Sequence, residues 1–172
     1  MGRSLLDDTK TRLSTSHKLF IVDYTGYLRL RGFEDHVNDW FFVKRGFLTC
    51  WLEPGFHNFW RVWNPGISYF CFRFYLLLGG RRKRELAAVV VFFVNGVLHN
   101  LLFSLITGRY SFPLPFTFLS FGALAVASQH LQKVFNQRRL PAIVNAAINI
   151  GLVIGSFDFG FRMNDILRLN LG

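Results

Sequence analysis

The hydrophobic pattern changes near the middle of the chain. Up to about residue 60, apolar residues alternate with charges, and no stretch reaches the roughly 20 apolar residues that a membrane-spanning helix needs. After Gly80, long apolar runs follow at 86–107, 112–128 and 141–161. Their lengths predict three membrane-spanning helices. The pattern therefore predicts an all-α integral membrane protein.

A shorter apolar run covers residues 67–78 and is interrupted by Arg73. It is too short to cross a bilayer alone, so it predicts a re-entrant helix or the inner half of a tilted one. Gly79 and Gly80 end it, and the basic cluster Arg81–Arg84 follows. The expected architecture therefore has about three to four spans plus interfacial or re-entrant helices.

The first third of the chain mixes aromatic and charged residues, as at 40–45, where Trp and Phe precede Lys and Arg. Aromatic rings beside cations are typical of the headgroup level, so this part is predicted to form interfacial helices. A small soluble subdomain packed on the membrane part is the alternative. We divide the chain into an interfacial region, 1–60, and a membrane domain, 61–172. The polar residues 1–18 lack the apolar segment of a cleaved signal peptide.

Composition and charge agree with a membrane location. The chain is 51% hydrophobic with 21 Phe, and its net charge is +10. Only three acids, Glu85, Asp158 and Asp165, follow Glu53, so the positive excess lies beside the apolar runs. The positive-inside rule then predicts that the loops at 81–84 and 133–139 are cytoplasmic. No nucleic-acid-binding motif is present, and the expected partners are the lipid bilayer and other membrane chains.

His99 is the strongest candidate for chemistry, because it lies midway along the run 86–107 and is its only ionisable residue. An ionisable group at bilayer depth usually faces protein or a water-filled cavity. Asn95 lies one helical turn earlier on the same face. A neutral imidazole can act as a general base. The alternative is a structural His that is hydrogen-bonded between helices.

A block rich in aromatic and polar residues, 53–68, precedes the short apolar run. Within it Trp60 and Trp63 flank Arg61, and Asn64 follows. Arg61 and Arg73 can pair with a phosphate or carboxylate, and Asn64 can donate to a carbonyl or developing oxyanion. An interfacial Trp/Arg belt, which needs no ligand, is the alternative.

Other chemistry finds little support in the sequence. Cys50 and Cys71 have no CxxC spacing and are expected to be buried free thiols. No set of His, Cys or carboxylates has metal-ligand spacing, so no metal is expected. No glycine-rich phosphate loop and no GxSxG motif occurs. A transporter would require inverted repeats, which are not apparent.

The residues from Phe59 to Gly80, FWRVWNPGISYFCFRFYLLLGG, resemble the membrane-bound O-acyltransferases. The likeness is to the bacterial branch that O-acetylates exopolysaccharides or D-alanylates teichoic acid. The family has a block F-W-x-x-W-[HN]-x-x-[IL]-S, an aromatic and Arg-containing segment that ends in Leu-Gly-Gly, a basic loop, and a span with a central His. The matching positions here are Trp60, Trp63, Asn64, Ser68, Arg73, Gly79, Gly80 and His99.

The resemblance implies that His99 is the catalytic base and that Asn64 is the polar residue of the upstream block. Trp60, Trp63, Arg61, Arg73 and Asn95 are then expected to contact substrates. The reaction would move an acyl group from a thioester donor to a hydroxyl, with no cofactor beyond that donor. The bacterial inner membrane is the implied location.

Two departures from the family pattern qualify the resemblance. The chain is short and is similar only to the C-terminal half of family members. Pro65 and Gly66 also replace the usual residues of the motif, and His99 lacks the acidic neighbour often seen beside it. Two functions therefore stay open: an O-acyltransferase or its catalytic half, and a non-catalytic accessory subunit of a larger membrane complex.

Overall fold

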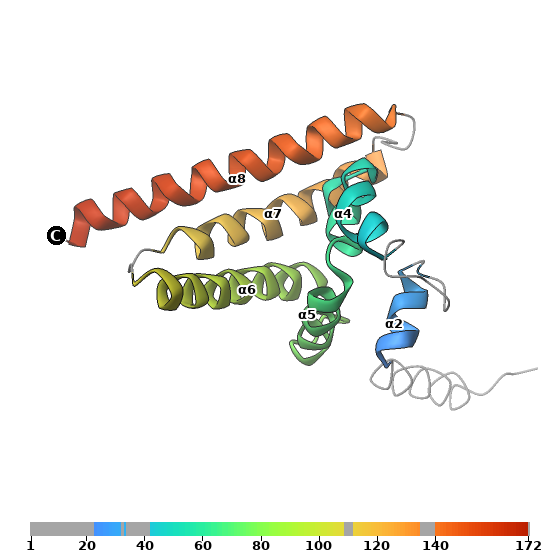
Figure 1. Cartoon of the computed structure of the whole chain (residues 1–172), viewed down its shortest axis with the longest axis horizontal. Helices are drawn as coiled ribbons and strands as arrows, with labels where there is room; N and C mark the ends of the chain where they lie inside the picture. Colours follow the sequence, from blue (N-terminus) through green and yellow to red (C-terminus); the bar gives the residue numbers. More distant parts are fainter. Residues whose placement is uncertain (1–22, 32, 34–41, 109–111, 135–139, 172) are drawn as a thin grey trace, which may run out of the picture.

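Three long helices form the body of the protein. The computed structural model describes residues 23–31, 33, 42–108, 112–134 and 140–171, and every structural statement concerns these ranges. The long helices are α6 (Arg84–Thr107), α7 (Pro113–Val134) and α8 (Ala142–Leu171) (Figure 1). Each is long and apolar enough to cross a membrane, and the described residues contain no strand. The predicted all-α membrane class is confirmed.

Two of the long helices run further than their apolar segments. α7 ends at Val134, six residues beyond the predicted end at 128, and α8 reaches Leu171, ten beyond 161. The added turns are polar but contain good helix formers, such as Gln129, Gln132 and Lys133. Hydrophobicity marks the part of a helix that enters hydrocarbon, so it understates the length of a helix that continues into the headgroup layer.

α6 and α7 are antiparallel neighbours that pack closely (Figure 1). Gly96 makes this approach possible, because a Cβ there would lie 2.7 Å from the carbonyl oxygen of Leu114 and from Cβ of Phe118. At the other end, His130 Nε2 lies 2.7 Å from Glu85 Oε1 and joins the end of α7 to the start of α6. Gly96 therefore lets the α7 backbone lie close against α6.

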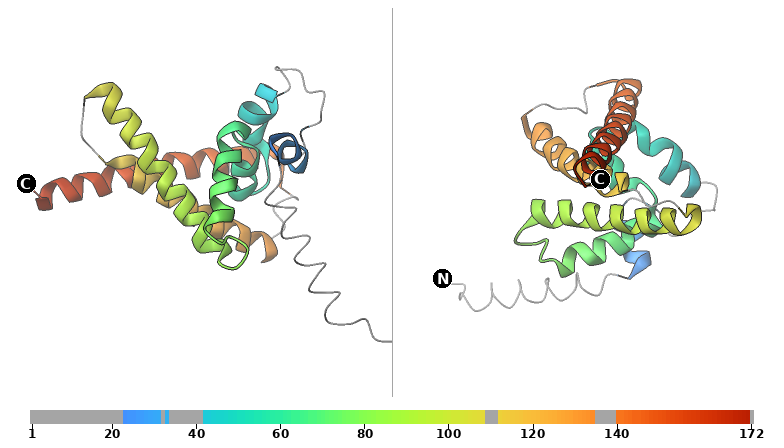
Figure 2. Two further views of the ribbon diagram at one scale, coloured as in Figure 1. Left: turned by 90° about the horizontal axis from the view of Figure 1, so that it is seen from below. Right: turned by 90° about the vertical axis from the view of Figure 1, so that its left-hand side faces the viewer.

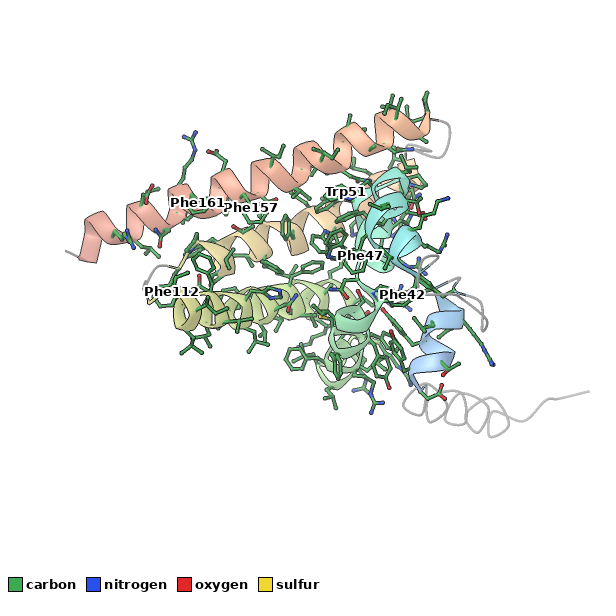
Figure 3. The ribbon with its side chains drawn as sticks, in the orientation of Figure 1. Phe42, Phe47, Trp51, Phe112, Phe157 and Phe161 are labelled. Carbon is green, nitrogen blue, oxygen red and sulfur yellow. The ribbon has the colours of Figure 1, made fainter. Side chains whose placement is uncertain are left out.

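α8 packs on α7 through small and polar side chains. The Ser120 and Ser156 hydroxyls are 3.0 Å apart, and Asn164 Oδ1 accepts from the Phe112 backbone N–H at 2.8 Å. Polar contacts between spans are favourable because hydrocarbon offers these groups no other partner. Figure 3 shows Phe112 at the start of α7 and Phe157 and Phe161 along α8.

The polar and small residues of α8 divide into two groups. Asn145, Asn149 and Ser156 are buried, as helix contact requires. Gly151 and Gly155 instead lie on the open side of α8, because a Cβ added at either position would meet no described atom within 4 Å. Composition identifies small and polar residues as suited to contacts between helices. It does not show which of them contact another helix of the same chain.

The short helices form a second layer beside one end of the long ones (Figure 2). They are α2 (Tyr24–Leu30), the π-helical turn η1 (Lys44–Leu48), the 3-10 turn η2 (Thr49–Leu52), α4 (Phe56–Val62) and α5 (Pro65–Leu77). Asn149 of α8 fixes this layer, because its fully buried Nδ2 donates to the carbonyls of Trp51 (2.8 Å) and Glu53 (3.0 Å). Figure 3 shows Trp51 and Phe47 in this layer beside α4.

Aromatic rings fill the space between the two layers. Phe56 and Phe59 of α4 are almost fully buried and stack at 5.8 Å, and Phe121 of α7 meets Phe56 at 6.0 Å. Trp60 packs on Phe121 at 4.8 Å. Such ring pairs contribute about 0.5–1.5 kcal/mol each beyond their buried area. They hold α4 against the membrane helices.

α5 is a short, well-defined helix. It has 13 residues and is therefore about 20 Å long, less than the roughly 30 Å of a hydrocarbon core. Asn64, in the left-handed region (φ 41°), caps its start, and Gly79, also left-handed (φ 72°), follows its end. The Tyr75 hydroxyl donates to the Gly80 carbonyl at 2.5 Å. The described geometry agrees with the expectation that this run does not cross a bilayer alone.

Gly160 provides a test of the α7–α8 contact. An added Cβ would lie 2.6 Å from the Pro113 carbonyl and would also meet Thr117. Gly160→Ala should therefore destabilise the protein by about 1–3 kcal/mol, because backbone cannot move aside cheaply. Thermal unfolding in detergent measures the change. Gly155→Ala is the matched control on the same helix and should be neutral or slightly stabilising; equal loss in both variants would contradict this packing.

Candidate functional site

A cavity of about 540 Å³ lies between the short helices and the α6–α7 pair. This volume falls within the usual range of small-molecule sites. The lining includes six of the seven predicted site residues, which come from α4, α5 and α6 or adjoin them: Trp60, Arg61, Trp63, Asn64, Asn95 and His99. Residues that are up to 39 positions apart in the sequence therefore share one cavity.

His99 is held by its own helix in a defined orientation. Its Nδ1 lies 2.8 Å from the Asn95 carbonyl oxygen. A carbonyl only accepts hydrogen bonds, so Nδ1 carries the proton in the neutral ring and Nε2 keeps its lone pair. The half-buried ring also stacks on Phe118 at 5.0 Å with an interplanar angle of 29°. This arrangement leaves Nε2 available to accept a proton.

Trp60 and Trp63 form an aromatic wall of the cavity. Trp60 contacts Phe92 of α6 at 5.2 Å, and Trp63 contacts Phe47 at 5.3 Å. The Trp60 Nε1–H is buried and has no hydrogen-bond partner among the described residues. The wall therefore offers apolar contact area and one indole donor.

Asn64 has a structural task as well as a place in the cavity wall. Its backbone N–H donates to the Gly46 carbonyl at 3.2 Å, and its side-chain Oδ1 accepts from the Ile67 N–H at 3.4 Å. Ser68, one turn on, donates its hydroxyl to the Trp63 carbonyl at 2.7 Å. The Oδ1 atom is thus used as a helix cap, which leaves the amide Nδ2 to donate elsewhere.

A second histidine lines the cavity. His57 Nδ1 lies 3.2 Å from the hydroxyl of buried Ser128 on α7. Burial lowers the pKa of His57 and the charge of Arg61 lowers it further, while Gln132 acts in the opposite direction. Sequence reasoning did not select His57, because nothing in the sequence shows that α4 packs against the end of α7.

The two histidines mark different depths of the cavity. His99 stacks on Phe118, whereas His57 contacts Ser128, ten positions later on α7 (128 − 118). At 1.5 Å per residue these contacts are about 15 Å apart along the helix. His57 lies at the end where α7 finishes and α6 begins, and His99 lies towards the middle of its span.

Arg73 is the one predicted site residue that does not line the cavity. It is exposed on α5, and its Nη1 donates to the Tyr69 hydroxyl at 3.2 Å. Two residues that sequence reasoning missed, Tyr27 and Arg31 of the α2 segment, do line it. Their i, i+4 spacing is visible in the sequence, but the docking of α2 beside α5 is not.

The described residues hold no cluster of three His, Cys, Asp or Glu side chains that could bind a metal ion. Cys50 is a buried free thiol, and Cys71 is a partly buried one. Burial raises the pKa of Cys50 to about 11, so this thiol is protonated at neutral pH and is a poor nucleophile.

The cavity that contains His99 therefore lies among helices that are long and apolar enough to cross a membrane. A family model for the membrane-bound O-acyltransferases matches residues 12–158. The match covers most of the chain, which belongs to this family. The search of curated proteins and the search of solved structures each gave no match.

The environment of His57 predicts how stability depends on pH. Because burial lowers its folded-state pKa, the unfolded chain binds this proton first as the pH falls below about 6.5. The folded state should therefore lose stability progressively below that pH and show no effect of this group above it. Thermal unfolding in detergent between pH 8 and pH 5 measures this. His57→Gln should flatten the profile, and Ser128→Ala, which keeps the imidazole, should not; indistinguishable profiles for wild type and His57→Gln would refute the assignment.

Proposed function

We propose that the chain is an O-acyltransferase, or the catalytic half of one, in which His99 is the general base. It transfers an acyl group from a thioester to a hydroxyl on a glycan, lipid or small molecule. The observation that carries the proposal is the His99 ring, which offers Nε2 from the middle of a span while its Nδ1 is held by the Asn95 carbonyl. Family membership supports the same reaction class.

In the proposed reaction, His99 Nε2 removes the proton of the acceptor hydroxyl as the oxygen attacks the thioester carbonyl. The tetrahedral intermediate carries an oxyanion. Its collapse forms the ester, breaks the carbon–sulfur bond and releases a thiolate. The imidazolium returns its proton to this sulfur, so the products are an ester and a free thiol, and His99 is neutral again.

Asn64 stabilises the oxyanion in this proposal. Its Oδ1 caps α5, which orients the amide, and the remaining Nδ2 donors can face a developing negative charge. Trp60 and Trp63 supply the apolar wall against which the acyl group lies, and Asn95 fixes the imidazole through its carbonyl.

The donor enters from the cytoplasmic side of a bacterial inner membrane. The start of α6, next to the basic residues 81–84, and the end of α7, with Lys133, lie together at the His130–Glu85 contact. This shared position supports one cytoplasmic face for the loops 81–84 and 133–139. In this proposal two arginines bind the donor's anionic groups. Arg61 lines the cavity, and Arg73 is exposed on α5.

The chain acts beside other membrane proteins and bound lipid. The expected likeness to the C-terminal half of longer family members supports this proposal, as does the outer side of α8, where a Cβ added at Gly151 or Gly155 would meet no described atom within 4 Å. In this proposal a partner chain covers this side of α8. The accessory-subunit alternative shares this surface but requires no reactive imidazole.

The replacement of His99 is the direct test of catalysis. His99→Ala should lower acyl transfer by about 10²–10⁴-fold, the usual contribution of a general base. Thiol release from an acyl-coenzyme A in proteoliposomes, and acyl label in the hydroxyl-bearing product, measure the loss. The amount of folded protein in the membrane should not change.

His130→Gln is the matched control, because His130 is exposed on α7 and does not line the cavity. It should keep transfer near the wild-type rate. Transfer that survives His99→Ala unchanged would exclude His99 as the base. Wild-type protein that joins a stable membrane complex but binds no acyl donor would favour the accessory function instead.

Asn64 allows its two tasks to be separated. Asn64→Asp keeps an oxygen that caps α5 but removes the amide donor, so transfer should fall by about 10²–10³-fold while unfolding temperature stays near wild type. Asn64→Gly suits the left-handed backbone but removes both functions, so it should lose transfer and the cap together. Full activity in Asn64→Asp would rule out the oxyanion role.

A further inference from the structure

Tyr27 presents a polar group that the described part of the protein does not satisfy. Its side chain is only 1% exposed, and its ring packs on Tyr69 at 5.5 Å and on Phe72 at 5.2 Å. The hydroxyl is buried, belongs to the cavity wall and has no hydrogen-bond partner among the described residues. A buried hydroxyl in this state is unfavourable unless something binds it.

Two guanidinium groups face the same part of the cavity. Arg31 Cζ lies 5.0 Å from the centre of the Tyr27 ring, and both Arg31 and Arg61 line the cavity. Neither forms a salt bridge with a carboxylate in the described ranges. The pKa of Arg61 is lowered, first by burial and then by the charge of Arg31, with smaller opposing effects from Tyr27 and from the carboxylate of Glu53. The three groups are therefore close enough to act on one another.

This arrangement places two like charges beside an unused hydroxyl, which is unfavourable for the protein alone. An anion between them would turn the repulsion into attraction and would accept from the hydroxyl as well. Guanidinium groups bind phosphate in a bidentate manner, and a phosphate monoester has three terminal oxygens and up to two negative charges. A carboxylate has fewer acceptor sites for three donors.

We propose that Tyr27, Arg31 and Arg61 form a phosphate-binding subsite in the wall of the cavity that also holds His99. The bound group is a phosphate ester. That this phosphate belongs to the acyl donor rests on the proposed function, whereas the subsite itself does not. The donor then spans the cavity with its phosphate at this subsite and its thioester near His99. An anionic lipid headgroup has the same chemistry, and the experiment distinguishes the two.

The test uses the full chain in nanodiscs of zwitterionic lipid and measures binding rather than transfer. Coenzyme A is the phosphate-bearing probe, and pantetheine is the same thiol arm without phosphates. Calorimetric titration should show coenzyme A binding at least about 10-fold more tightly than pantetheine, because pantetheine lacks the phosphate groups that form charge-assisted hydrogen bonds. Its affinity should also fall with rising salt.

Variants assign the effect to the three residues. Arg31→Gln and Arg61→Gln should each weaken coenzyme A binding by about 10-fold or more, and Tyr27→Phe by a few-fold, with no change for pantetheine. Arg162→Gln is the matched control, because Arg162 is exposed on α8, pairs with Asp158 and lies outside the cavity wall, and it should bind as wild type. Removing either charge relieves repulsion, so both Gln variants should fold. If one of them does not fold, the Lys variant at the same position, Arg31→Lys or Arg61→Lys, takes its place and should bind coenzyme A with intermediate affinity.

Equal affinity for coenzyme A and pantetheine, or unchanged binding by both Gln variants, would overturn the subsite. If phosphatidylglycerol binds in a way that depends on Arg31 and Arg61 and coenzyme A does not, the subsite stands and its phosphate belongs to a lipid. His99→Ala should bind coenzyme A as wild type. A chain that binds the probe through Tyr27 and the two Arg residues but transfers no acyl group therefore refutes the proposed function without refuting the subsite.

Discussion

Hydrocarbon supplies no hydrogen bonds, so each polar group that enters it must be satisfied by the protein. This constraint organises the structure. Asn149, on the apolar helix α8, is fully buried, and its Nδ2 donates to two carbonyls of the η2 region, while its Oδ1 has no partner among the described residues. The same two bonds attach the aromatic layer of short helices to the long ones. The His57–Ser128 hydrogen bond and ring contacts hold the layer at other places.

The cavity follows from how this layer is attached. α4 is held near the end of α7 through Phe56, Phe121 and the His57–Ser128 contact, and α5 leaves it at the left-handed Asn64. The space enclosed between α4, α5, α6 and α7 is apolar on most sides. Its polar groups lie at separate depths, with His99 towards the middle of a span and the guanidinium groups on the shorter helices. A ligand with an anionic end and a reactive end matches this separation.

The sequence was sufficient for some of these features and not for others. Three spans and the imidazole at bilayer depth could be predicted, because long apolar runs and a charge-bearing side chain within one are local signals. The grouping of Trp60, Asn64 and His99 was expected from a family resemblance rather than from periodicity. Tyr27 and Arg31 were missed, and Arg73 points elsewhere, because these positions depend on how α2 and α5 pack. No local pattern encodes that packing.

The hydrogen bond from His99 to a main-chain carbonyl has a consequence for the timing of the proposed reaction. A carbonyl carries no net charge, so the ring has an aligned partner but no counter-ion in contact with it among the described residues. In the proposed reaction, the proton that the ring takes up is therefore not held there by an ion pair with a described carboxylate. Proton uptake and proton return are then closely coupled in the proposed reaction, and a thioester suits this site because its thiolate leaves the carbonyl carbon without prior protonation, whereas an alkoxide needs a proton in order to leave.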